Sequence, residues 1–136
     1  MIRRALPTLL RMLPDATVRR DVPYLGSFAF GLRRHRWLWG TGAIRGHANV
    51  LGQIAHFIQP GAVVYDIGAN IGYYVRFMQR YLPVDSIVAF EPMRANVRLL
   101  ETNIARGPRP DRVRVYPVAL SDRTERELLQ VDDMTD

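Results

Sequence analysis

The stretch that most constrains this chain of 136 residues is VVYDIGANIG, at residues 63–72. Residues 63–65 are β-branched or aromatic, which favours a strand covered on both faces, as in a parallel sheet. Gly68 and Gly72 then permit a tight turn that brings bare backbone close to a ligand. Apolar residues recur at helical spacing from there to Leu82. The stretch therefore predicts a strand, a glycine loop and a helix.

The spacing of this loop narrows the class of ligand. Asp66 ends the strand, at the edge where open α/β sheets bind small molecules. A nucleotide-phosphate loop needs a lysine after its last glycine, and the chain contains no lysine. The nicotinamide fingerprint G-x-G-x-x-G requires a glycine where Asn70 stands, which weakens that interpretation without removing it. The pattern that remains is D-x-G-x-x-x-G.

A second buried strand is predicted at residues 86–91, SIVAFE, and it ends in Glu91. An ionised carboxylate offers two acceptor oxygens, so Glu91 can accept hydrogen bonds from both hydroxyls of a ribose. Alternatively, Glu91 caps a helix that starts near Met93, because Pro92 suits the first turn of a helix. The residues alone leave both roles open.

A third unit repeats the pattern of helix and strand. Apolar spacing predicts a helix over residues 95–104, and VRVYPVAL predicts a strand over residues 113–120. Ser121 and Asp122 follow, and from chemistry alone they are typical of a plain turn. Strands that alternate with helices predict an α/β fold, here a Rossmann-like, doubly wound parallel sheet.

Three motifs in order, DIGANIG, AFEPMRANVRLLETNI and VRVYPVALSD, resemble the FkbM family of class I S-adenosylmethionine-dependent methyltransferases, over about residues 60–131. The resemblance implies that the cofactor is S-adenosylmethionine. It also implies that Asp66 faces the methionine moiety, that Glu91 holds the ribose and that Asp122 lies at the adenine. The implied cofactor-binding residues are Asp66, Gly68, Ala69, Asn70, Gly72, Glu91, Ala119, Leu120 and Asp122.

The reaction that the resemblance implies is methyl transfer from the sulfonium to an oxygen, with a hydroxyl of a small molecule or sugar as acceptor. The family's fourth strand, with its lysine and acidic residues, has no counterpart here. We therefore expect a sheet truncated after three strands and a chain that is inactive alone. The general base should lie in the missing portion, so we name no catalytic residue. Two alternatives stay open: a non-catalytic module that binds an adenosine cofactor, and a fragment of a nicotinamide-dependent oxidoreductase.

Charge divides the chain into two parts. All 19 basic residues are arginine; residues 1–45 carry a net charge of +7 and residues 46–136 a net charge of −1. We expect a basic N-terminal segment at 1–45 and the N-terminal half of a methyltransferase domain at 46–136. LRRHRWLWG at 32–40 predicts a half-buried strand. Its arginines and tryptophans also suit nucleic-acid stacking, but the pattern does not recur, so we expect no specific nucleic-acid partner.

Other sequence features limit which partners and which cellular compartment we expect. No apolar stretch reaches the length of a transmembrane helix, and none is expected. His47 and His56 lack neighbouring carboxylates at ligand spacing, so we expect no metal. The cofactor favours a cytoplasmic location. The strand at residues 63–65 would lack a neighbour on one side, and we expect self-association through that exposed edge.

Overall fold

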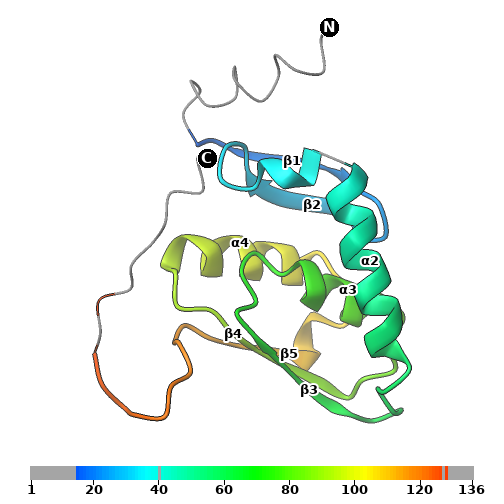
Figure 1. Cartoon of the computed structure of the whole chain (residues 1–136), viewed down its shortest axis with the longest axis vertical. Coiled ribbons are helices and arrows are strands. Elements are labelled where there is room, and N and C mark those ends of the chain that lie inside the picture. The colour runs from blue at the N-terminus through cyan, green and yellow to red at the C-terminus, as the bar shows by residue number, and fades with distance from the viewer. Residues whose placement is uncertain (1–14, 40, 127, 129–136) are drawn as a thin grey trace, which may run out of the picture.

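The computed structural model describes residues 15–39, 41–126 and 128. In chain order its elements are β1 (Thr17–Val22), β2 (Gly26–Gly31), the short 3-10 helix η1 (Arg36–Trp39), α2 (Thr41–Ala55), β3 (Val63–Ile67), α3 (Tyr73–Tyr81), β4 (Ser86–Phe90), α4 (Arg94–Ala105), the 3-10 turn η2 (Pro110–Arg112) and β5 (Val113–Tyr116). Figure 1 shows three layers, with α3 and α4 between the β1–β2 hairpin and the β3–β4–β5 sheet.

The larger sheet is parallel throughout, with strand order β3-β4-β5. Asp66 of β3 pairs with Ala89 of β4, which in turn pairs with Val115 of β5. The expected α/β fold with a parallel sheet is therefore confirmed. The strand predicted over residues 113–120 is β5, and it ends at Tyr116. Pro117 has no N–H with which to continue the hydrogen-bond ladder.

Both helices that follow strands pack on the same face of this sheet (Figure 1). Successive right-handed crossovers in one direction place their helices on one side. The core between them is formed by Ala69, Val75, Met78, Leu82, Val84, Ile87, Ala89, Leu100 and Ile104.

The opposite face of the sheet is bare within the described residues. The side chains of Val63, Tyr65 and Ile67 are 53%, 62% and 66% exposed. The expectation that residues 63–65 are covered on both faces is therefore wrong for the described part of the chain. The doubly wound arrangement would need helices on this second face.

The hairpin formed by β1 and β2 was not predicted from the sequence. It contributes to a second core, which contains Val22, Leu25, Phe28, Phe30, Leu38, Leu51, Ile71 and Tyr73. The side chain of Asn103 in α4 makes two hydrogen bonds to the backbone of Ala29 in β2. It accepts from the N–H at 2.7 Å and donates to the carbonyl at 2.9 Å. The same amide donates to the carbonyl of Ile71 at 2.8 Å. The hairpin is thereby tied to both α4 and the glycine loop.

Residues 32–39 form a turn followed by η1, so the strand expected at 32–40 is wrong over its described part. Local bonds explain the difference, because the N–H of His35 donates to the carbonyl of Gly31 and that of Leu38 to the carbonyl of His35. The boundary expected between residues 45 and 46 falls inside α2. Among the described residues, no helix has the length and apolar character needed to cross a bilayer.

Candidate functional site

The glycine loop connects β3 to α3 with three left-handed residues. Their φ angles are +83° at Gly68, +51° at Asn70 and +87° at Gly72. The loop is held against the next strand, because the N–H groups of Gly68 and Ala69 both donate to the carbonyl of Phe90 at 2.9 Å. The turn therefore lies at the carboxyl ends of β3 and β4, where the sequence placed it.

The two glycines have different surroundings. A Cβ at Gly68 would meet no atom within 4 Å, whereas a Cβ at Gly72 would lie 2.6 Å from Cδ1 of Leu100. Gly68 therefore borders open space, and Gly72 permits close packing of the loop on α4. Of these two glycines, only Gly68 leaves room for a ligand beside the backbone.

Glu91 is 5% exposed, and its carboxylate receives three hydrogen bonds. Oε2 accepts from the N–H of Asn70 at 2.8 Å, while Oε1 accepts from the N–H of Met93 at 2.9 Å and from the side chain of Asn96 at 3.3 Å. Met93 is the residue before α4, so Oε1 makes the helix-capping interaction. By lone-pair count a carboxylate has about four acceptor sites, so Glu91 retains one for a ligand.

Asp66 lies one strand away from Glu91, and its environment is quite different. It is 9% exposed, and within the described part of the chain its Oδ2 atom is buried without a hydrogen-bond partner. Burial, with a smaller contribution from the charge of Glu91, raises the pKa of Asp66 to about 6. A buried carboxylate without a partner is unfavourable, and perturbed acids of this kind are typical of binding sites. Asp66 suits a ligand group that is cationic or donates hydrogen bonds.

A cluster of aromatic residues at the start of α3 borders Asp66. Burial and the charge of Asp66 raise the pKa of Tyr74, which keeps its hydroxyl protonated at neutral pH. That hydroxyl forms a hydrogen bond of 2.7 Å with Nδ1 of His47, and the tautomer of the imidazole sets which group donates. The ring of His47 also lies 5.0 Å from that of Trp37 and 5.3 Å from that of Tyr73, centroid to centroid. No trio of potential metal ligands occurs in the described residues.

The last three implied cofactor-binding residues lie in the exposed segment that follows β5; they are Ala119, Leu120 and Asp122. The N–H of Glu91 donates to the carbonyl of Tyr116 at 3.1 Å, so this segment leaves the sheet next to Glu91. Asp122 accepts from Ser121 at 3.2 Å and pairs with Arg123 at 3.7 Å. Across the described residues, no hydrogen bond or ion pair joins Ala119, Leu120 or Asp122 to the glycine loop. The structure brings Asp66, Glu91 and the loop together, but not this segment.

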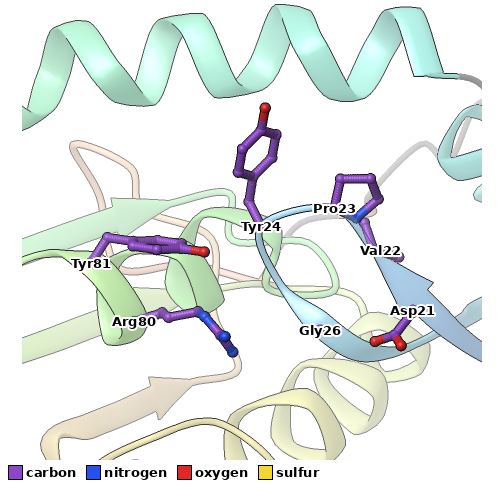
Figure 2. A pocket seen from close by; sticks show the side chains of 7 residues that line it. All are labelled: Asp21, Val22, Pro23, Tyr24, Gly26, Arg80 and Tyr81. Carbon is purple, nitrogen blue, oxygen red and sulfur yellow. The ribbon is translucent and has the colours of Figure 1, made fainter.

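Two pockets lie away from the glycine loop, near the end of α3. One, of about 360 Å³, is shown in Figure 2 and is lined by Asp21, Val22, Pro23, Tyr24, Gly26, Arg80 and Tyr81. Its neighbour, of about 410 Å³, shares Tyr24 and Tyr81. Arg80 and Tyr81 end α3, whereas the glycine loop begins it. Neither pocket contains a residue of the predicted cofactor site.

No protein-family model matches the chain. A curated relative, the AMB antimetabolite synthetase AmbE of Pseudomonas aeruginosa, is 41% identical over 70 residues. The aligned stretch covers 52% of this chain and 3% of the synthetase. The chain is therefore similar to a small part of a much longer protein.

Proposed function

We propose that this chain binds S-adenosylmethionine at the glycine loop and is the cofactor-binding portion of an FkbM-type methyltransferase, acting on a hydroxyl of a small molecule or sugar. The observation that carries this proposal is the buried Oδ2 of Asp66, which has no hydrogen-bond partner among the described residues, two residues before the open space at Gly68. The methionine end of the cofactor carries an ammonium group. A cation at this position supplies the partner that the buried carboxylate otherwise lacks.

Glu91 and the glycine loop also support the proposal that S-adenosylmethionine is the ligand. Glu91 retains about one acceptor site, which suits one ribose hydroxyl. The left-handed backbone at Gly68 leaves that side of the loop free of side chains. Methyl transfer from the sulfonium to an oxygen is an in-line displacement, so the role of these residues is to hold and orient the cofactor.

The charges disfavour a nicotinamide dinucleotide at this site. A dinucleotide would bring its anionic pyrophosphate to the loop, close to the carboxylates of Asp66 and Glu91. Like charges in a partly buried site repel each other. S-adenosylmethionine has no phosphate, and the methionine moiety that would face Asp66 carries an ammonium and a sulfonium against one carboxylate, so its net charge is positive.

Calorimetric titration of the purified chain with S-adenosylhomocysteine, S-adenosylmethionine and NAD tests the proposal. We expect both adenosyl ligands to bind more tightly than NAD. Glu91→Ala should weaken their binding by about 1.5–3 kcal/mol, the range for a hydrogen bond to a charged group. If Glu91→Ala fails to fold, Glu91→Gln replaces it, because glutamine keeps one oxygen acceptor. Glu101→Ala, at an exposed acid, is the control. Tighter binding of NAD would overturn the proposal.

A further inference from the structure

The turn between β1 and β2 holds a tyrosine at a position that usually belongs to glycine. The N–H of Leu25 donates to the carbonyl of Val22 at 3.0 Å, which closes a turn with Pro23 and Tyr24 at its centre. Proline followed by a residue with positive φ is typical of a type II turn. The φ angle of Tyr24 is +70°, which costs energy in a residue with a Cβ, and yet the residue is 51% exposed. Backbone strain that presents an exposed aromatic ring is a feature of ligand-binding sites.

Tyr24 lines both of the pockets near the end of α3. Their volumes, about 360 Å³ and 410 Å³, are in the range of small-ligand sites. Tyr81 lines both pockets as well, and Phe77 lines the second. Figure 2 shows the ring of Tyr24 projecting from the turn towards α2. The two pockets therefore adjoin, and together they form a tyrosine groove bordered by aromatic rings from the hairpin turn and from α3.

Two side chains of opposite charge line the first pocket without pairing. Arg80 reaches from α3 to the hairpin, where a Cβ at Gly26 would lie 3.6 Å from its Nη1 atom. In Figure 2, Asp21 lies on the other side of Gly26, with its carboxylate directed towards the guanidinium of Arg80. Within the described part of the chain, neither side chain belongs to an ion pair. A cation and an anion that face each other across a pocket suit a ligand that carries both charges.

We propose that the tyrosine groove is a second binding site, which takes a free aromatic α-amino acid. The ring of the ligand lies against Tyr24 and Tyr81, its carboxylate pairs with Arg80 and its ammonium with Asp21. An aromatic acid without the ammonium group fits less well, because Asp21 repels its carboxylate. The glycine loop precedes α3 and the groove lies at the end of α3, so this inference does not depend on the proposed function.

Titration of the isotopically labelled chain with L-phenylalanine, followed by amide chemical shifts, tests for the site. Exposed ion pairs are weak, so we expect shifts of Tyr24, Arg80 and Tyr81 at millimolar ligand, and none in the glycine loop. Phenylpropionate lacks the ammonium, phenylethylamine lacks the carboxylate and L-alanine lacks the ring, so each should bind more weakly than L-phenylalanine. Unshifted amides at the groove, or tighter binding of any of these three compounds, would overturn the proposal.

Substitutions at Tyr24 and Arg80 test the two halves of the site. Asparagine tolerates the left-handed conformation but has no aromatic ring, so Tyr24→Asn should remain folded and bind L-phenylalanine about tenfold more weakly. Tyr24→Phe keeps the ring and should keep the affinity. Arg80→Gln should weaken binding by about two- to fivefold, the effect of an exposed ion pair, whereas Arg98→Gln, at an exposed arginine of α4, should not. Unchanged affinity in Tyr24→Asn or in Arg80→Gln would refute the assignment, and Arg80→Gln decides alone if Tyr24→Asn does not fold.

Discussion

Asp66 lies near the carboxyl end of β3 and Glu91 directly follows β4, and burial together with the charge of Glu91 raises the pKa of Asp66 to about 6. The two carboxylates are unequal. Glu91 receives three hydrogen bonds, from the loop and from α4, whereas Oδ2 of Asp66 receives none from the described residues. Glu91 therefore supports the architecture of the site, and Asp66 remains free to pair with a ligand.

Asp66→Asn should stabilise the unliganded fold at neutral pH. The folded-state pKa of Asp66, about 6, lies above its ordinary value of 3.8. The contribution of this group to stability is thus fully present below the ordinary value and is lost as the pH rises through about 6. A shift of about two units corresponds to roughly 3 kcal/mol at neutral pH, which is the upper limit of the gain.

Urea denaturation across this pH range measures the effect. The difference in free energy of unfolding between Asp66→Asn and the wild type should shrink as the pH falls from about 6 towards 3.8. Asp85→Asn, at an exposed aspartate, is the matched control and should show no such trend. A gain that does not change with pH would mean that ionisation of Asp66 is not its cause.

Alanine at the two loop glycines should separate binding from folding. Both positions have positive φ, so each alanine costs roughly 1–2 kcal/mol of backbone strain. Gly72→Ala should cost more, because its Cβ would collide with Leu100, whereas Gly68→Ala faces open space. We expect Gly68→Ala to remain folded while losing affinity for S-adenosylhomocysteine. Thermal unfolding with and without the ligand compares the two variants, and an equal loss of stability in both would contradict this assignment.

The bare face of the sheet should drive self-association. Tyr65 stacks on Phe90 with ring centroids 6.2 Å apart, and Phe90 stacks on Tyr116 at 5.5 Å, so an aromatic row crosses all three strands. β3 is also an edge strand, which can pair with another chain. Ile67→Lys should shift sedimentation towards the monomer, and Val50→Lys, at an exposed apolar residue of α2, should not. A wild-type chain that sediments as a monomer would refute the prediction.

The parallel sheet and its loop could be predicted because their signals are local. β-branched runs, a glycine pair and helical spacing lie within short stretches, and the predicted strands and helices of residues 63–116 all occur. The capping role of Glu91 was also foreseeable, since Pro92 and the helix start follow it directly. Asn96, which also contacts Glu91, was missed, although an asparagine in the first turn of a helix can reach back to a preceding carboxylate.

The hairpin and its contribution to the site could not be predicted in the same way. The period-two spacing of His35, Trp37 and Trp39 predicted a strand over residues 32–40. Hydrogen bonds from the N–H groups of His35 and Leu38 to nearby carbonyls close a turn instead. The hydrogen bonds between Asn103 and Ala29 join residues far apart in the chain. No local pattern encodes such a contact, because it depends on how the hairpin packs on α3 and α4.

The most direct test of the central claim, that Asp66 pairs with the ammonium group of an adenosyl ligand, is the number of protons released when S-adenosylhomocysteine binds. A neighbouring ammonium lowers the pKa of a carboxyl group. At pH 6 free Asp66 is about half protonated, so binding should release about half a proton. Calorimetry in buffers of different ionisation enthalpy gives this number. The account predicts release at pH 6 that disappears at pH 8 and in Asp66→Asn; the same release in Asp66→Asn, or proton uptake by the wild type, would contradict it.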